Sequence, residues 1–289
     1  MSFSLPRMAR QAGKRRDIVL RPIIPTQAAA ADLAAIYAPA WQIWADNIDR
    51  ILAGYDPQPL PTADTLTVDT VDQVQAAISS VAQEFLTILT ARIAPGLRNF
   101  AVRAERVHRS KFAASVKAGV GIDVDMLMSA QDVEETLGTF LARNAALVRN
   151  VSDQAQARIS DAVFRGYQNR TPIRDVAKEI RSATGMGRTR ATGIASDQVS
   201  KLSGALDTER MANAGISLWK YRHSGKLHPR STHKERDGRI YTLNGNRQVN
   251  ADGSKMSGGD VIEPGDEPSS PPWCGCRKQS YIPLLSKIE

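Results

Sequence analysis

The sequence predicts a mainly α-helical protein, with a helical N-terminal region and a small α+β module at the C-terminal end. Alanine is plentiful in the first two thirds of the 289-residue chain, and aromatic residues make up only 6% of it, which favours helix over sheet. From about residue 26 to about residue 214, apolar residues recur every three to four positions, the spacing of one helix face. Strand-like stretches are confined to the part that follows, so we expect a helical body that carries a terminal module.

We expect three parts along the chain. Residues 1–25 lack helical periodicity, are rich in Arg and contain three prolines, so they predict a basic flexible arm. Residues 26–160 contain a series of amphipathic stretches and are assigned to a helical region. Residues 161–289 contain the remaining helices and the terminal module.

Proline and glycine mark where helices should begin and end. Pro39 is expected to kink or split the first helix of the helical region, and Pro95-Gly96 to end the long helix after it. Another helix should run from Asp123 to Arg149, with a weak break before the next apolar stripe. Thr171-Pro172 supplies a hydroxyl N-cap followed by proline at the first helical position. Gly215 is suited to cap the last helix.

The formal net charge of +8 is concentrated in three basic clusters, at residues 7–21, 98–117 and 220–239. Such clusters suit a polyanionic partner, because Lys and Arg bind phosphates and release counterions without reading bases. The alternative is that they only keep exposed helix faces soluble. His108 lies in the second cluster without a partner nearby in the sequence, and we expect it at the surface. The candidate nucleic-acid contacts are Arg98, Arg103, Arg106, Arg109, Lys111, Lys226, Arg230, Lys234 and Arg236.

Three features of the sequence indicate where the protein is expected to reside. No stretch of about 18 apolar residues occurs, so no membrane span is expected. The N-terminus has basic residues but lacks the apolar core of a signal peptide. The only two cysteines are separated by one residue, which is not the pattern of a secreted disulfide framework. We therefore expect a protein that stays in a reducing cytosol.

The terminal module extends over residues 216–277. It begins with strand-like apolar residues, passes through a His-x-x-x-Asp-Gly turn and a second short strand, and ends on Cys-x-Cys-Arg. Trp219 is expected in the core of the module. Gly238 should occupy a turn position with positive φ that aims the two strands, and Arg277 should have a structural role. The connector at residues 243–272 is too polar and too rich in turn formers for a regular element.

The thiols and imidazoles of this module are candidate metal ligands. Two thiolates and an imidazole, with a fourth ligand from a histidine or carboxylate, would suit tetrahedral Zn²⁺. However, only one residue separates the cysteines, whereas structural zinc pairs usually have two or more between them. Alternatively, the histidine hydrogen-bonds the backbone of the Asp-Gly turn while both cysteines pack as small apolar residues; a disulfide between them would be strained. The cofactor is therefore left open, with zinc as the candidate and with the candidate ligands His233, Cys274, Cys276, and His228 or Asp237.

A catalytic alternative uses the same residues. His228, His233 and Asp237 in a basic setting could form a metal-dependent nuclease or toxin-like enzyme in which a histidine activates water. Such sites need several carboxylates or histidines converging on one ion, and residues 220–238 contain few carboxylates. No phosphate-binding loop of the Walker type is present either. We therefore expect a protein that is not an enzyme.

Several motifs of the C-terminal half occur in an informative order. They are a long helix at 190–206, Ala-Gly-Ile-x-x-Trp at 214–219, Arg-x-x-His-x-x-x-Asp-Gly at 230–238, Pro-Gly at 264–265 and Cys-Gly-Cys-Arg at 274–277. In this order they resemble the phage head morphogenesis family, the Mu F-like minor head proteins, from about Ala162 to Pro283. The family often has Ala-Arg-Thr-Glu in the long helix, where this sequence has Ala-Ser-Asp-Gln at 195–198.

The resemblance implies a minor capsid protein of a tailed phage or prophage that is associated with the portal vertex and acts in head assembly, DNA packaging or DNA delivery. It implies portal protein and major capsid or scaffold proteins as partners, with residues 26–160 as the candidate docking region. Double-stranded DNA would be contacted without sequence specificity. The expected location is the virion, in the head interior or at the portal vertex, and the host cytoplasm during assembly. A plain DNA-binding module that acts in the host is a further alternative.

Overall fold

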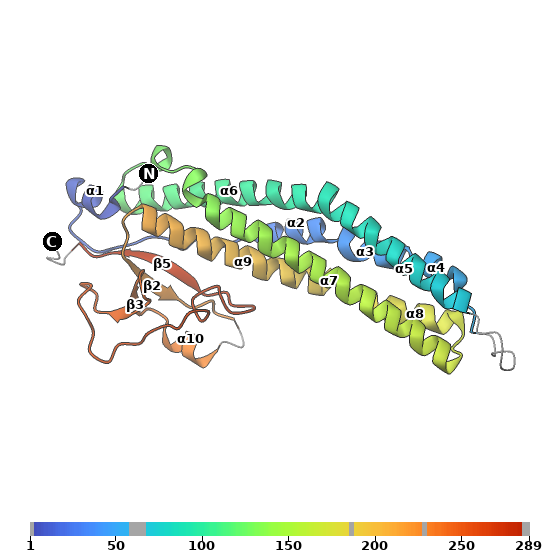
Figure 1. Ribbon diagram of the computed structural model, residues 1–289. Helices are drawn as coiled ribbons and strands as arrows, with labels where there is room; N and C mark the ends of the chain where they lie inside the picture. The colour runs from blue at the N-terminus through green and yellow to red at the C-terminus, as the bar shows by residue number, and fades with distance from the viewer. Residues whose placement is uncertain (1–2, 58–67, 185–187, 227–229, 285–289) are drawn as a thin grey trace. The chain divides into compact units, whose positions relative to one another are not determined.

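The computed structural model, drawn as a ribbon in Figure 1, describes residues 3–57, 68–184, 188–226 and 230–284. The chain divides into two compact units. Unit 1 comprises residues 1–30, 101–140 and 196–289, and unit 2 comprises residues 31–100 and 141–195. The described residues are mainly helical and include a small antiparallel sheet formed largely by the C-terminal part of the chain, which confirms the predicted fold class.

The regular elements follow in chain order. The α-helices are α1 (Leu5–Gln11), α2 (Gln27–Tyr37), α3 (Pro39–Asp46), α4 (Ile48–Ile51), α5 (Val68–Ile88), α6 (Ala94–Val120), α7 (Glu134–Asn169), α8 (Ile173–Thr184), α9 (Arg188–Asn213) and α10 (Ser231–Glu235). Short 3-10 turns are η1 (Leu52–Gly54), η3 (Asp125–Leu127) and η4 (Gln131–Val133), and η2 (Leu89–Ile93) is π-helical. The strands are β1 (Ile18–Val19), β2 (Leu218–Arg222), β3 (Ile240–Thr242), β4 (Gln248–Val249) and β5 (Arg277–Ile282).

The sheet of unit 1 has the strand order β1-β5-β2-β3-β4, and all its pairs are antiparallel. Trp219 in β2 lies opposite Tyr241 in β3 and Ser280 in β5. Because side chains alternate along a strand, Trp219, Tyr221 and Tyr241 share one face, and all three are fully buried. Trp219 stacks on Tyr241 with 5.0 Å between ring centroids, which confirms its predicted place in the core.

The first residues of the chain differ from the expected flexible arm. Phe3 and Leu5 donate backbone hydrogen bonds to the carbonyls of Asn213 and Ala214 at the end of α9. Leu5 and Ala9 are fully buried, because their four-residue spacing puts both on one face of α1. Strand β1 then pairs with β5. A helix this short gives almost no periodic signal, so the sequence pattern missed it.

Of the two prolines expected to interrupt helices, one does so and the other does not. Pro39 splits the first helical stretch as predicted, because α2 ends at Tyr37 and α3 begins at Pro39. Pro95-Gly96 does not end the next one: the π-helical segment η2 leads directly into α6. A wider turn accommodates the proline ring, which would otherwise clash with the carbonyl four residues earlier. A Cβ on Gly96 would lie 3.0 Å from Ile36 Cγ2, so glycine permits this close helix contact within unit 2.

The expected boundary between residues 160 and 161 falls inside α7, a single 36-residue helix. The stretch expected to be helical from Asp123 instead starts with the 3-10 turns η3 and η4, and α7 begins only at Glu134. No break precedes Ile159, which is fully buried. Gly215, with φ +65°, caps α9 as predicted: Ile216 N donates to Met211 O. The weak helix break expected before Ile159 does not occur, because a weak apolar pattern does not interrupt backbone hydrogen bonding within α7.

Candidate functional site

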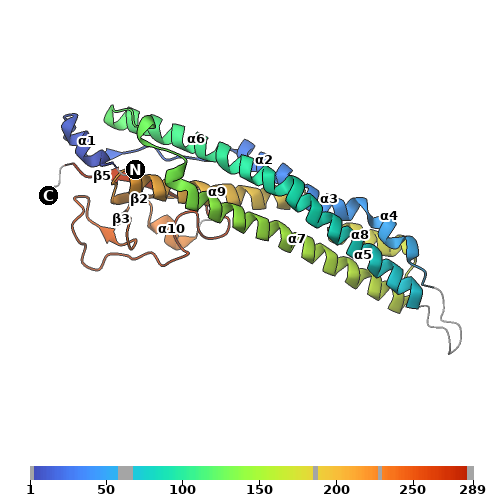
Figure 2. The same cartoon turned by 45° about the horizontal axis from the view of Figure 1, so that its top comes forward.

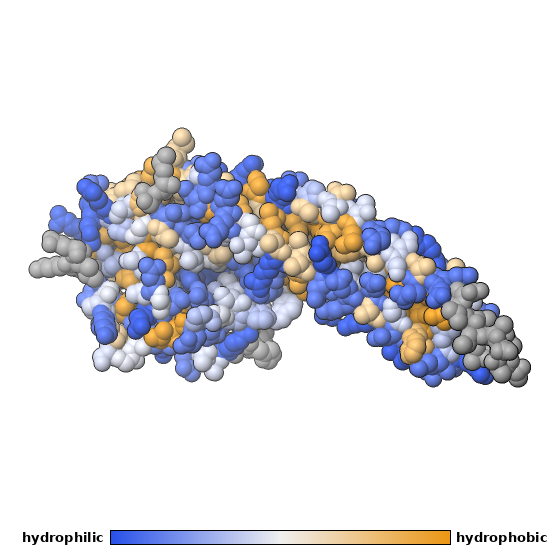
Figure 3. Space-filling model, viewed as in Figure 1, coloured by the Kyte–Doolittle hydropathy of each residue, from blue (hydrophilic) through white to orange (hydrophobic). Residues whose placement is uncertain are grey.

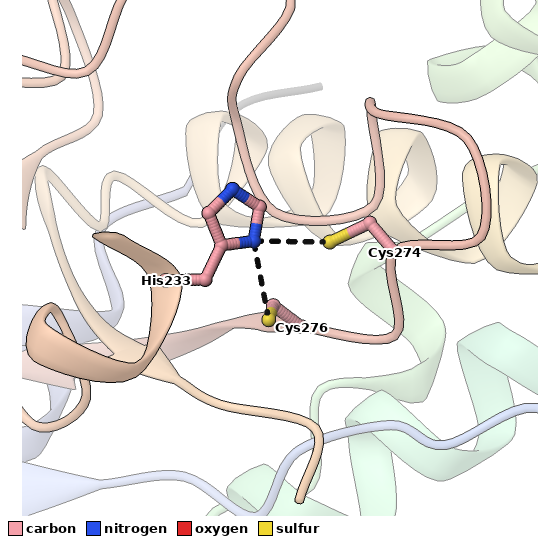
Figure 4. Close-up of side chains that lie close together, drawn as sticks. All are labelled: His233, Cys274 and Cys276. Carbon is pink, nitrogen blue, oxygen red and sulfur yellow. Dashed lines mark hydrogen bonds between the residues drawn. The ribbon is translucent and has the colours of Figure 1, made fainter. Parts of the chain in front are cut away.

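Three of the candidate ligands meet inside unit 1 (Figure 4). His233 lies on α10, Cys274 in the loop before β5 and Cys276 immediately before that strand. His233 Nδ1 is 3.6 Å from Cys274 Sγ and 3.7 Å from Cys276 Sγ. All three side chains are buried, and their ligand atoms lie within 4.8 Å of one another. We call this group the His-Cys-Cys cluster.

The short helix that carries His233 lies beside the strands β2 and β3 (Figure 2). It is followed by Gly238, whose φ of +83° confirms the predicted left-handed turn position. Gly238 N donates to Tyr221 O, and Tyr221 N donates to Arg239 O, so the turn is tied to the end of β2. The imidazole of His233 also meets the Tyr221 ring edge-on, with 5.9 Å between centroids. The turn thereby directs the histidine toward the buried face of the sheet.

The second nitrogen of His233 is held by a residue that the sequence analysis did not single out. Nε2 lies 2.9 Å from Asp266 Oδ1. Asp266 also accepts a hydrogen bond from Arg236 Nη1, and Arg236 Nε donates to Asp260 Oδ2 at 2.7 Å. Tyr241 donates to the same Asp260 oxygen at 2.9 Å. Asp266 lies in the polar connector among other aspartates and many turn formers, so nothing in the local sequence marks it as the partner of His233.

Arg277 fixes the backbone that carries the two cysteines. Its guanidinium donates from Nη1 to Cys276 O at 3.0 Å and to Ser269 Oγ at 2.8 Å. From Nη2 it donates to Ser200 Oγ of α9, and that hydroxyl is 3.5 Å from Cys274 O. Burial lowers the pKa of Arg277, and nearby negative groups oppose this effect. The Cys-x-Cys-Arg end is therefore a loop clamped to α9 by its own arginine.

A carboxylate of α9 holds the other side of this loop. Asp197 Oδ1 accepts a hydrogen bond from Trp273 N at 2.7 Å, and its Oδ2 pairs with Lys201. Trp273 has a φ of +63°, a strained conformation for a residue with a side chain, and the residue is 55% exposed. The hydrogen bond to Asp197 anchors the backbone of this tryptophan. Asp197 thus has a structural role within the Ala-Ser-Asp-Gln sequence.

The electrostatics of the cluster favour a thiolate. Hydrogen bonding from the Cys276 thiol lowers the pKa of Cys274 below its usual value, whereas the same interaction and burial raise the pKa of Cys276, so one thiol of the pair ionises more readily than the other. Burial, followed by the hydrogen bond and charge of the cysteine pair, raises the pKa of Tyr221. A thiolate is both a nucleophile and a metal ligand, so the site is suited to bind a soft cation.

The remaining candidate ligands are not part of the cluster. Asp237 accepts a hydrogen bond from His223 N at 2.8 Å and lies 3.9 Å from Arg222, so it caps the end of β2. It is absent from the group of ligand atoms that converge among the described residues. His228 lies outside the residues that the structure describes. The structure therefore does not bring Asp237 to the His-Cys-Cys cluster.

Most of the basic candidates are exposed, and some of them also make contacts within the chain. Arg98, Arg103 and Arg106 are exposed on α6, and Lys234 is exposed on α10. Four others donate to backbone carbonyls: Arg109 to Met128, Lys111 to Ile24, Lys226 to Trp273 and Arg230 to Pro272. Hydrophilic residues cover much of the molecular face in Figure 3, between smaller apolar areas.

Two expectations about charged residues need correction. Arg236 is only 9% exposed and is bound to Asp260 and Asp266, so its guanidinium is not free to contact phosphate. His108 is not at the surface: it is 4% exposed, and its Nε2 lies 3.0 Å from the buried Asp207. The carboxylates that bind Arg236 and His108 are far away in the sequence, which is why local patterns assigned both residues to the surface.

The antiparallel sheet, the long helix α9 and the buried His-Cys-Cys cluster define an α+β module with a thiol-imidazole site. Residues 156–278 match the family described as Phage Mu protein F like protein. This match confirms the resemblance to the Mu F-like phage head morphogenesis family over these residues.

A relative of unknown role is also similar to this chain. An uncharacterized protein of Haemophilus influenzae is 27% identical over 143 residues, which are 49% of this chain and 32% of that protein. The chain therefore spans about a third of the length of this curated relative. No solved structure matches the chain. Among the described helices, none combines the length and apolarity needed to cross a bilayer.

Proposed function

We propose that this protein is a minor structural component of a tailed-phage or prophage head that acts at the portal vertex during head assembly, DNA packaging or DNA delivery. The observation that carries the proposal is the family match over residues 156–278. Portal protein and major capsid or scaffold proteins are the proposed partners, and the helices of residues 26–160 are the proposed docking surface. The proposed location is the virion, in the head interior or at the portal vertex.

A contact with double-stranded DNA is part of this proposal. Exposed guanidinium groups on α6, at Arg98, Arg103 and Arg106, can approach phosphates and release counterions. No base-reading element is needed for a protein that lies against packaged DNA of any sequence. Lys226 and Arg230, which support the loop before Cys274, carry charge at the surface of unit 1 as well.

A role without catalysis fits the site better than the nuclease or toxin-like enzyme. A hydrolytic metal site needs an open coordination position that substrate can reach. The cluster side chains are at most 5% exposed, and Asp237, the carboxylate expected to assist, caps β2 instead. The wild-type protein should therefore leave duplex DNA and RNA intact in the presence of Zn²⁺ or Mg²⁺. Cleavage that EDTA abolishes and His233→Ala removes would favour the enzyme.

The location of the polypeptide tests the proposal most directly. Induced phage or prophage particles would be purified by density gradient, and quantitative mass spectrometry would compare this protein with the portal protein. We expect it in mature heads at a copy number close to that of the portal and far below that of the major capsid protein. A lysogen without the gene should produce fewer filled heads. A protein found only in the soluble host fraction, with normal heads in its absence, would refute the proposal and favour a DNA-binding module acting in the host.

A further inference from the structure

The distances in the His-Cys-Cys cluster are those of metal ligands. In a tetrahedral site, Zn–S and Zn–N bond lengths place sulfur and nitrogen about 3.6 Å apart. The observed separations from His233 Nδ1 to the two sulfurs are 3.6 and 3.7 Å. The view in Figure 4 shows both sulfurs facing the same ring nitrogen. That nitrogen has a single lone pair, so it cannot accept a good hydrogen bond from two thiols at once.

The surroundings of His233 prepare its Nδ1 for a cation. Asp266 accepts from Nε2, which places the ring proton on that side and leaves the Nδ1 lone pair directed at the sulfurs. Arg236 holds Asp266 in turn, and Asp260 holds Arg236. A carboxylate behind a ligating histidine fixes the tautomer and orients the ring, which is the usual support of a zinc-bound imidazole.

The thiols are held in place before any ion arrives. The carbonyl of Cys274 accepts from Ser200, and the carbonyl of Cys276 accepts from Arg277 and Ser269. Asp197 holds the backbone of the strained Trp273. Gly275 allows the cysteine loop to lie close to Ser224, because a Cβ on residue 275 would be 2.9 Å from Ser224 Cβ. This clamp explains how a cysteine pair with one intervening residue can present both sulfurs to one point.

The donor set selects the kind of ion. Two thiolates and one imidazole are soft or borderline ligands that suit Zn²⁺, whereas Ca²⁺ and Mg²⁺ prefer oxygen. Two thiolates would also balance the charge of a divalent ion in a buried site. An ion here would join α10 to the start of β5 across a long connector of mostly irregular structure. Metal binding at such a link contributes directly to folding.

We propose that His233 Nδ1, Cys274 Sγ and Cys276 Sγ bind one Zn²⁺ that has a structural role in unit 1. The three side chains supply three of the four positions of a tetrahedral ion. The ion fastens the histidine turn to the loop before β5 and so stabilises the polar connector between them. This inference does not depend on the proposed role in phage heads.

The full chain, purified without a polyhistidine tag and under reducing, oxygen-free conditions, provides the test. Elemental analysis should find about one Zn²⁺ per chain. After chelation, titration with Co²⁺ should produce the ligand-field bands of a tetrahedral ion together with thiolate-to-cobalt charge transfer. X-ray absorption at the zinc edge should show two sulfur neighbours and at least one imidazole. These measurements use the wild-type chain, so they do not depend on a variant that folds.

Variants then assign the ligands. Cys276→Ser and His233→Gln should each lower the zinc content at least about tenfold. Asp237→Asn is the matched control, because the sequence suggested this carboxylate and the structure places it elsewhere; it should keep the wild-type zinc content. A wild-type chain that stays free of zinc and gives no cobalt spectrum at stoichiometric metal would overturn the proposal. Equal loss of zinc in Asp237→Asn and Cys276→Ser would refute the ligand assignment.

Discussion

His233 and Asp266, which are 33 residues apart, meet through a 2.9 Å contact between Nε2 and the carboxylate. This contact gives the buried imidazole a defined tautomer. It also links the His-Cys-Cys cluster to the ion-paired network of Arg236 and Asp260. The connector of residues 243–272 therefore has a definite structural role, because it supplies the carboxylate that orients the histidine.

Replacement of Asp266 should weaken metal binding without removing a ligand. Asp266→Ala leaves the Nε2 proton without its acceptor, so the ring loses orientation and basicity. We expect the Zn²⁺ affinity to fall about 10–100-fold, measured by competition with a chromophoric chelator. Glu263→Gln, an exposed acidic residue of the same connector, is the control and should leave the affinity unchanged. Equal affinities for all three proteins would show that the carboxylate does not support the site.

Arg277 should be important for the stability of unit 1. Arg277→Ala removes the donors to Cys276 O, Ser269 Oγ and Ser200 Oγ, so three buried hydrogen bonds that hold the cysteine loop are lost. We expect a loss of roughly 1–3 kcal/mol in the free energy of unfolding, measured by urea denaturation. Arg222→Ala, which removes an exposed arginine 3.9 Å from Asp237, should cost less than about 0.5 kcal/mol. A similar loss of stability in both variants would contradict the inference that Arg277 clamps the cysteine loop to α9.

Two glycine substitutions should have opposite effects. Gly275→Ala forces a new Cβ to within 2.9 Å of Ser224 Cβ, so the cysteine loop must move. We expect lower stability and a lower zinc content. In Gly138→Ala the new Cβ, on helix α7, meets nothing within 4 Å, and the change should raise the free energy of unfolding by about 0.5–1 kcal/mol. Thermal denaturation of both variants provides the measurement. A Gly138→Ala variant less stable than the wild type would contradict the finding that a Cβ at this position meets no neighbour.

Asp207 gives a prediction about pH. Burial raises its pKa above the usual range, although the hydrogen bond and charge of His108 oppose this shift. A carboxyl with a raised folded-state pKa stabilises the fold most when it is protonated, below the unfolded value of about 3.9, and this contribution is lost as the pH rises through the folded-state pKa. Asp207→Asn keeps an acceptor for His108 and removes the charge.

The variant should therefore become more stable relative to the wild type as the pH rises. The free energies of unfolding of both proteins, measured from the unfolded-state pKa of about 3.9 upward, give this difference directly. The exposed Asp153→Asn serves as control and should show little pH-dependent difference. A wild type that gains stability over Asp207→Asn toward high pH would mean that the ion pair with His108 outweighs burial.

Exposed arginines of α6 should contribute to DNA binding through phosphates. Arg103→Ala/Arg106→Ala should weaken binding to duplexes of unrelated sequence to the same extent. The slope of log affinity against log salt should become less negative by about 0.9 for each phosphate that the variant no longer binds. Arg174→Ala/Lys178→Ala on α8 removes the same charge from another exposed helix and is the matched control. Fluorescence anisotropy at several salt concentrations provides the measurement. An unchanged slope would show that this face of α6 does not contact DNA phosphates.

Local patterns predicted several elements of the structure correctly. The split at Pro39 and the cap at Gly215 follow from backbone constraints of single residues. The burial of Trp219 follows from the apolar alternation of its strand. Patterns failed where distant residues decide the outcome, as for His108 with Asp207. At Pro95 they failed because a π-helical turn absorbs the proline within a continuous helical stretch.

Periodicity and side-chain chemistry were enough to predict the mainly helical class, the strands β2 and β3 and the residue types of the cluster. Tertiary structure alone decided that Asp266 supports His233, that Arg236 is bound internally and that Asp237 caps β2 instead of joining the cysteines. These choices depend on distances between residues that are far apart in the chain or on the direction in which a side chain points. Folding sets both, and no spacing in the sequence encodes either.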